Sequence, residues 1–148
     1  MPSGPFGWQG VPEIAEHSWA YPALEVVHIV GIALLFGNLV LLELRVWGVG
    51  PALPLRSLAR LALSLTVLGF ALLAASGLTM FAAAPGELLA NRAFVVKMGL
   101  VGLAGLNAVA FHFRGGLSRI DSRARAQTAL SVGLWLAVIV CGRWIAYV

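Results

Sequence analysis

Four long stretches of the chain contain no Asp, Glu, Lys or Arg, and they dominate its pattern of polar and apolar positions. These stretches cover residues 26–42, 61–86, 98–113 and 126–142. With its flanks, each is about long enough for an α-helix to cross a hydrocarbon core, which needs roughly 20 residues. The pattern therefore predicts four membrane-spanning helices, at about residues 19–47, 55–83, 91–113 and 126–148.

Glycine and proline mark the boundaries between these helices. Residues 48–54 combine both residue types, and Pro85-Gly86 follows the second apolar run. Residues 1–18 are also rich in glycine and proline and carry Glu13, Glu16 and His17, so we expect a polar amino-terminal segment at the membrane surface. Short connections predict an all-α, integral membrane, up-down-up-down four-helix bundle, with residues 19–148 as a single transmembrane domain.

Composition excludes an ordinary soluble domain. Hydrophobic residues make up 60% of the chain and charged residues 11%, whereas soluble domains have about 45–50% and about 25%. The first partner is therefore the lipid bilayer. The net charge of +4 arises from residues between the apolar runs, so no nucleic-acid partner is expected. The single cysteine, Cys141, excludes an intrachain disulfide.

The arginines predict the orientation of the bundle in the membrane. Connections of short multi-pass proteins that carry Lys and Arg stay in the cytoplasm. The first and third connections are expected on one side because they are two spans apart, so both termini should face outward, toward the periplasm. The arginines that flank these two connections are Arg45, Arg56, Arg60, Arg114, Arg119, Arg123 and Arg125.

Ionisable residues inside membrane helices are costly, and they are therefore the candidates for function. At a rise of about 1.5 Å per residue, Glu25 and His28 lie roughly 9 and 13 Å below the outer end of the first predicted helix. Lys97 and Arg143 lie roughly 9 and 8 Å below the outer ends of the third and fourth. These four residues are predicted to share one layer, whereas His112 lies at the opposite end.

Haem is the cofactor whose requirements match this layer. Haem iron takes axial nitrogen or sulfur donors, its propionates attract cations, and its flat ring needs apolar walls. His28 is the expected iron ligand, with Lys97 opposite it if the amine is deprotonated. Arg143 is the expected propionate partner, and Glu25 orients His28 or pairs with a cation. The small residues expected to admit the ring are Gly31, Gly77 and Gly102.

Each of these assignments has a structural alternative. His28 can simply hydrogen-bond to a neighbouring helix, and Lys97 and Arg143 can extend toward the interface. A structural role is expected for His112. Gly99, Gly102 and Gly105 suit close helix packing, and Asn38 and Asn107 suit hydrogen bonds across helices. A homo-oligomer also stays open.

Two other functional classes fit the same residues. A copper-handling protein would use imidazole and thioether donors that open to the outer side. A structural accessory subunit of a larger membrane complex would use the bundle for packing alone. The donors available for copper are His17, His28, Met80 and Met98.

Several of these residues fall in segments that resemble an uncharacterised family of small bacterial four-helix membrane proteins. The resemblance covers residues 19–112. It rests on Trp19-Ala-Tyr-Pro22, on His28-Ile-Val-Gly-Ile-Ala-Leu-Leu-Phe-Gly37 and on Glu43-Leu-Arg45, followed by Ser76-Gly-Leu-Thr-Met-Phe-Ala-Ala-Ala-Pro85, Asn91, Phe94-Val-Val-Lys97 and Asn107.

That family is similar in layout to the membrane-bound protoporphyrinogen oxidases and to the copper-resistance D proteins of bacteria. The resemblance implies haem b held by His28 and Lys97, an inner-membrane location, and electron transfer or a redox step with a quinone, a porphyrin or a redox partner protein. The oxidase group's Pro-Arg sequence is absent, because this chain has Leu41-Leu-Glu-Leu-Arg45 there. The oxidase reaction is therefore not carried over, and whether the chain is a haem-dependent oxidoreductase stays open.

Overall fold

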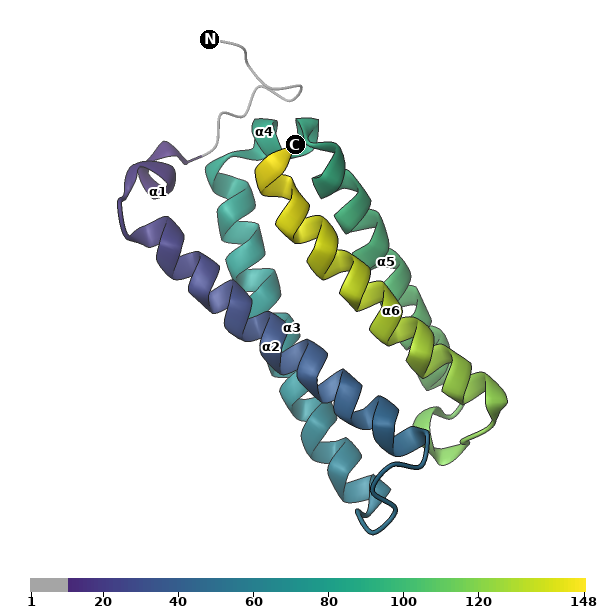
Figure 1. Ribbon diagram of the computed structural model, residues 1–148. Coiled ribbons are helices and arrows are strands. Elements are labelled where there is room, and N and C mark those ends of the chain that lie inside the picture. The colour runs from purple at the N-terminus through teal and green to yellow at the C-terminus, as the bar shows by residue number, and fades with distance from the viewer. Residues whose placement is uncertain (1–10) are drawn as a thin grey trace.

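The computed structural model describes residues 11–148, and within this range every regular element is helical (Figure 1). Four helices are long, and these confirm the predicted all-α four-helix fold: α2 (Ala20–Val46), α3 (Leu55–Ala83), α5 (Arg92–Phe113) and α6 (Ser122–Trp144). The short elements are α1 (Pro12–Glu16), α4 (Pro85–Ala90) and the 3₁₀ turns η1 (Gly116–Ser118) and η2 (Ile145–Tyr147).

The last long helix begins four residues before the predicted start at position 126. Asp121 precedes it, and its carboxylate accepts a hydrogen bond of 2.8 Å from the Ala124 N–H. Such a cap satisfies one of the free N–H groups in the first helical turn. Arg123 and Arg125, which we expected in the loop, therefore belong to the start of α6.

The long helices form two antiparallel pairs, α2 with α3 and α5 with α6, and α2 also packs against α6 (Figure 1). The termini of the described chain lie at one end of the bundle, which we call the terminal end. The connections 47–54 and 114–121 lie at the other, which we call the arginine-rich end. Helix α1 packs against α2 and α3 at the terminal end, where the Val11 N–H donates to the Ala82 carbonyl at 2.9 Å.

Small residues bring α2 and α3 into backbone contact. Along α3 the buried residues Ala62, Gly69, Ser76 and Ala83 recur every seven positions, which is the spacing of a helix packed in coiled-coil fashion. A Cβ added to Gly69 would lie 2.7 Å from the Gly31 carbonyl oxygen. The two glycines therefore permit the close crossing that small residues give to membrane helices.

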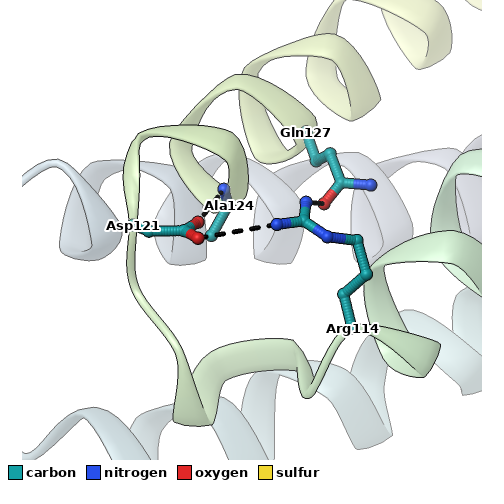
Figure 2. A network of polar contacts seen from close by, with 4 residues as sticks. All are labelled: Arg114, Asp121, Ala124 and Gln127. Atoms are coloured by element: carbon teal, nitrogen blue, oxygen red, sulfur yellow. Dashed lines mark hydrogen bonds and ion pairs between the residues drawn. The ribbon is translucent and has the colours of Figure 1, made fainter.

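A polar network joins α5 to α6 at the arginine-rich end. Figure 2 shows the Arg114 guanidinium donating to the Gln127 side-chain oxygen at 2.8 Å and pairing with Asp121 at 3.5 Å. The Ala124 N–H, and then the charge of Arg114, hold the pKa of the Asp121 carboxyl below its usual range. The predicted hydrogen bond of Asn107 across helices is confirmed, because its amide donates to the Gln127 carbonyl at 2.9 Å.

All four long helices are long and apolar enough to cross a membrane. Their outward faces expose large apolar side chains, and Val67, Leu78 and Leu106 are each 68% exposed. Water would penalise so much exposed apolar surface, whereas hydrocarbon would not. The surface of the bundle is therefore compatible with a lipid bilayer around it.

Candidate functional site

His28 rests on α3 through a specific polar contact. Its Nδ1 atom lies 2.9 Å from the Ser76 hydroxyl oxygen, which belongs to a residue only 2% exposed. The next residue, Gly77, leaves room for the ring, because an added Cβ there would lie 3.4 Å from His28 Cε1. The half-buried imidazole of His28 therefore lies against Ser76 and Gly77 of α3.

Lys97 is half-buried on α5 and lies against α6. Its Nζ atom is 3.3 Å from the position that a Cβ on Gly142 would take. Within residues 11–148 the amine forms no ion pair. The two predicted iron ligands thus lie in the region near the terminal end of the bundle, His28 against α3 and Lys97 against α6.

Aromatic contacts lie on either side of this region. Phe81 of α3 stacks on Phe94 of α5, with ring centroids 5.8 Å apart. Phe81 lies one helical turn from Gly77, and Phe94 one turn from Lys97, so this stack adjoins the site on its terminal side. Farther toward the arginine-rich end, Phe70 and Trp135 join α3 to α6 with an edge contact at 6.3 Å. Along the bundle axis, the region of His28 and Lys97 thus lies between these two aromatic contacts.

The other two ionisable residues predicted for this layer, Glu25 and Arg143, are exposed. Arg143 is exposed, donates to the Tyr147 hydroxyl at 2.8 Å and stacks over that ring at 5.1 Å. Glu25 is exposed too, and within residues 11–148 it forms no ion pair with Lys97 or Arg143. The expected roles of Glu25 and Arg143 in binding a cofactor stay predictions. His112 is exposed at the arginine-rich end, with Nδ1 3.1 Å from the Ala108 carbonyl oxygen.

The three glycines predicted to admit a ring have different surroundings. Gly31 is buried at the crossing of α2 and α3, and this packing role requires no cofactor. Gly77 adjoins His28 as described above. Nothing lies within 4 Å of a Cβ added to Gly102, and the residue is exposed. Of the three, only Gly77 lies beside a predicted ligand.

Asn91 is a site-positioning residue that the sequence analysis did not identify. Its side-chain oxygen caps α5 by accepting from the N–H groups of Ala93 at 3.0 Å and Phe94 at 3.3 Å. Its amide donates to the carbonyls of Ile145 at 3.1 Å and Val148 at 2.8 Å. Asn91 therefore fixes the start of α5 against the end of α6, and hence Lys97 against Gly142. An asparagine directly before an apolar helix is the signal that indicates such a cap.

The donors proposed for copper belong to different elements: His17 follows α1, and His28, Met80 and Met98 lie on α2, α3 and α5. Within residues 11–148 no group of three or more His, Cys, Asp and Glu side chains is placed to hold a metal ion. His17 and Met98 are exposed. Two shallow grooves occur elsewhere, one at the terminal end beside Asn91 and Trp144 and one beside His112, and neither is lined by His28 or Lys97.

Comparison of the chain with protein-family models, with curated proteins and with solved structures finds no match. The family resemblance accordingly rests on the quoted residues and stays a hypothesis.

His28 and Lys97 carry donor atoms of a kind that haem iron accepts. An imidazole and an amine are both nitrogen donors, and each lies against a glycine of a neighbouring helix. Apolar aromatic contacts bound the region on both sides. Iron in haem accepts such axial donors and favours apolar surroundings. The chemistry of the donor set therefore fits the cofactor.

Proposed function

We propose that this protein is a haem b-binding, multi-pass protein of the bacterial inner membrane that transfers electrons. His28 and Lys97 would hold the iron. The observation that supports this most directly is the 2.9 Å contact between His28 Nδ1 and the hydroxyl of the buried Ser76. Histidine ligands of metals nearly always donate their second ring N–H to a fixed acceptor.

The proposed ligand pair favours electron transfer over oxygen activation. Haem iron, when bound, supplies a one-electron redox centre whose potential depends on its axial donors and surroundings. With nitrogen donors from α2 and α5 on both sides, a substrate would find no open coordination position. The electron partner would be a quinone, a porphyrin or a redox partner protein that approaches from the membrane or its surface. Arg143, exposed near the terminal end, is the proposed propionate partner.

An absorption spectrum of the detergent-purified protein, oxidised and reduced, tests the proposal. We expect a Soret band in the wild type and its loss in His28→Ala. His112→Ala is the matched control, because it removes an exposed histidine at the other end of the bundle, and its spectrum should equal that of the wild type. Lys97→Ala should shift the reduced bands by removing one axial nitrogen.

The same measurement separates the alternatives. A wild-type Soret band that persists unchanged in His28→Ala contradicts the assigned ligand. A colourless protein that carries copper supports the copper-handling class. A colourless, metal-free protein that copurifies with other membrane subunits supports the accessory-subunit class. Unchanged reduced bands in Lys97→Ala would remove the lysine from the coordination while leaving His28 in place.

We further propose that the arginine-rich end faces the cytoplasm. In a Cys141→Ser background, Ala52→Cys places a thiol in the exposed connection between α2 and α3, and Val148→Cys places one at the terminal end. In cells with a permeabilised outer envelope, a membrane-impermeant maleimide should label Val148→Cys at once and Ala52→Cys only after lysis. Labelling of Ala52→Cys at once and of Val148→Cys only after lysis would show that the arginine-rich end faces outward, which contradicts the proposed orientation.

A further inference from the structure

The hydroxyl oxygen of Ser76 lies within hydrogen-bond distance of three other atoms, but the hydroxyl has only one hydrogen to donate. Its oxygen lies 2.6 Å from the Leu72 carbonyl oxygen, 3.3 Å from that of Leu73 and 2.9 Å from His28 Nδ1. A serine hydroxyl has one hydrogen to donate and lone pairs to accept with. A carbonyl oxygen can only accept. Whether Ser76 donates to His28 or accepts from it therefore depends on which atom receives the hydroxyl hydrogen.

The contact to Leu72 fixes that hydrogen. At 2.6 Å two oxygens without a hydrogen between them would set lone pair against lone pair, so the hydroxyl must donate to the Leu72 carbonyl. Ser76 then has only lone pairs left for His28. The imidazole must therefore donate its Nδ1–H to the serine, and in the neutral ring Nε2 carries the free lone pair.

We infer that Ser76 is a positioning residue that holds His28 in the Nδ1–H tautomer and thereby keeps Nε2 available as a donor to a metal or other Lewis acid. As an assignment of Nε2 to haem iron, this inference rests on the proposed function. The tautomer itself does not, because it follows from contacts within the chain. Nearly complete burial of Ser76 shields the bond from competing water.

Another serine of α3, Ser64, provides a matched control for Ser76. Ser64 lies on the same helix and donates to the Arg60 carbonyl at 2.8 Å, the same backward bond across four residues, but it is exposed and contacts no histidine. Ser64→Ala thus removes an equivalent helix bond without touching the site. Ser76→Thr keeps a hydroxyl at the site, whereas Ser76→Ala removes it.

Nitrogen NMR of protein labelled with ¹⁵N-histidine and prepared without haem tests the tautomer directly. The chain has three histidines, and the signals that vanish in His28→Ala identify position 28. At about pH 9, where neutral rings prevail, His28 should show a protonated Nδ1 and an unprotonated Nε2. Ser76→Ala should move the ring toward the Nε2–H tautomer, while Ser76→Thr and Ser64→Ala should leave the wild-type signals.

A protonated Nε2 in the wild type would overturn the inference, and so would unchanged His28 signals in Ser76→Ala. If Ser76→Ala fails to fold, the wild-type spectrum still decides, since it reports the tautomer without any substitution. In the haem-bound protein, Ser76→Ala should weaken haem binding by about 10-fold or more, as loss of a ligand's orienting partner does. A wild type with the expected tautomer but no Soret band would reject the proposed function and leave the tautomer assignment standing.

Discussion

Replacement of Gly69 by alanine should separate α2 from α3 and lower the free energy of unfolding by about 3 kcal/mol, at the upper end of the usual cost of overpacking. The added Cβ would lie 2.7 Å from both the Gly31 carbonyl oxygen and the Leu35 nitrogen. Both are backbone atoms, which cannot turn aside as a side chain can, so the helices themselves must move apart. The shift in the unfolding midpoint, measured with increasing SDS in mixed micelles, reports this loss.

Gly102→Ala is the control for this prediction. Both glycines lie within long helices, but nothing lies within 4 Å of a Cβ on Gly102. Alanine at such a position should stabilise the helix by about 0.5–1 kcal/mol, because it loses less backbone entropy on folding. Equal effects of the two substitutions would show that the glycines do not act through the crossing.

The same crossing positions the candidate site. Ser76 follows Gly69 by two helical turns on the same buried face of α3, and His28 precedes Gly31 by one turn on α2. Helices that move apart at the glycines would therefore lengthen the bond between His28 and Ser76. We accordingly expect Gly69→Ala to perturb the His28 nitrogen signals even though it touches neither residue.

Asn91→Ala should be the second most damaging change outside the proposed ligands, with a loss of about 3 kcal/mol. Loss of a helix cap costs about 1 kcal/mol. The two hydrogen bonds to the carbonyls of Ile145 and Val148 contribute about 1 kcal/mol each. The substitution removes all of them together, and thermal unfolding in detergent, followed by circular dichroism, measures the sum.

Asn91→Asp separates the two functions of this side chain. An aspartate keeps the oxygen that caps α5 but lacks the N–H groups that reach the end of α6. Its stability should fall between those of the wild type and Asn91→Ala. A full loss in Asn91→Asp would assign the effect to the contact with α6, whereas no loss would assign it to the cap.

The sequence was sufficient to predict the helical spans and their order. Hydrocarbon requires every backbone N–H and C=O to be bonded within its own segment, so long uncharged runs have essentially one solution. The span 55–83 agrees with α3 at both ends. The start of α6 was displaced because the cap of Asp121 extends a helix beyond its apolar run, into residues whose charge suggested a loop.

The sequence also indicated His28 and Lys97, since an ionisable group within an apolar run is unusual whatever the fold. It placed Glu25 and Arg143 in the same layer on depth alone, and depth carries no information about direction around the helix axis. The structure instead leaves both exposed and directs Arg143 to Tyr147.

By itself, then, the sequence determined which segments are helical, how they follow one another and which polar groups lie within them. Only the tertiary structure decided that His28 contacts Ser76 and that Lys97 lies against Gly142. It also decided that α2 and α3 cross at Gly31 and Gly69. The physical reason is that these helices are apolar on all sides, so hydropathy does not distinguish a face toward lipid from a face toward a neighbour. That choice is made by close packing of small residues and by a few buried hydrogen bonds, which exist only once the helices are side by side.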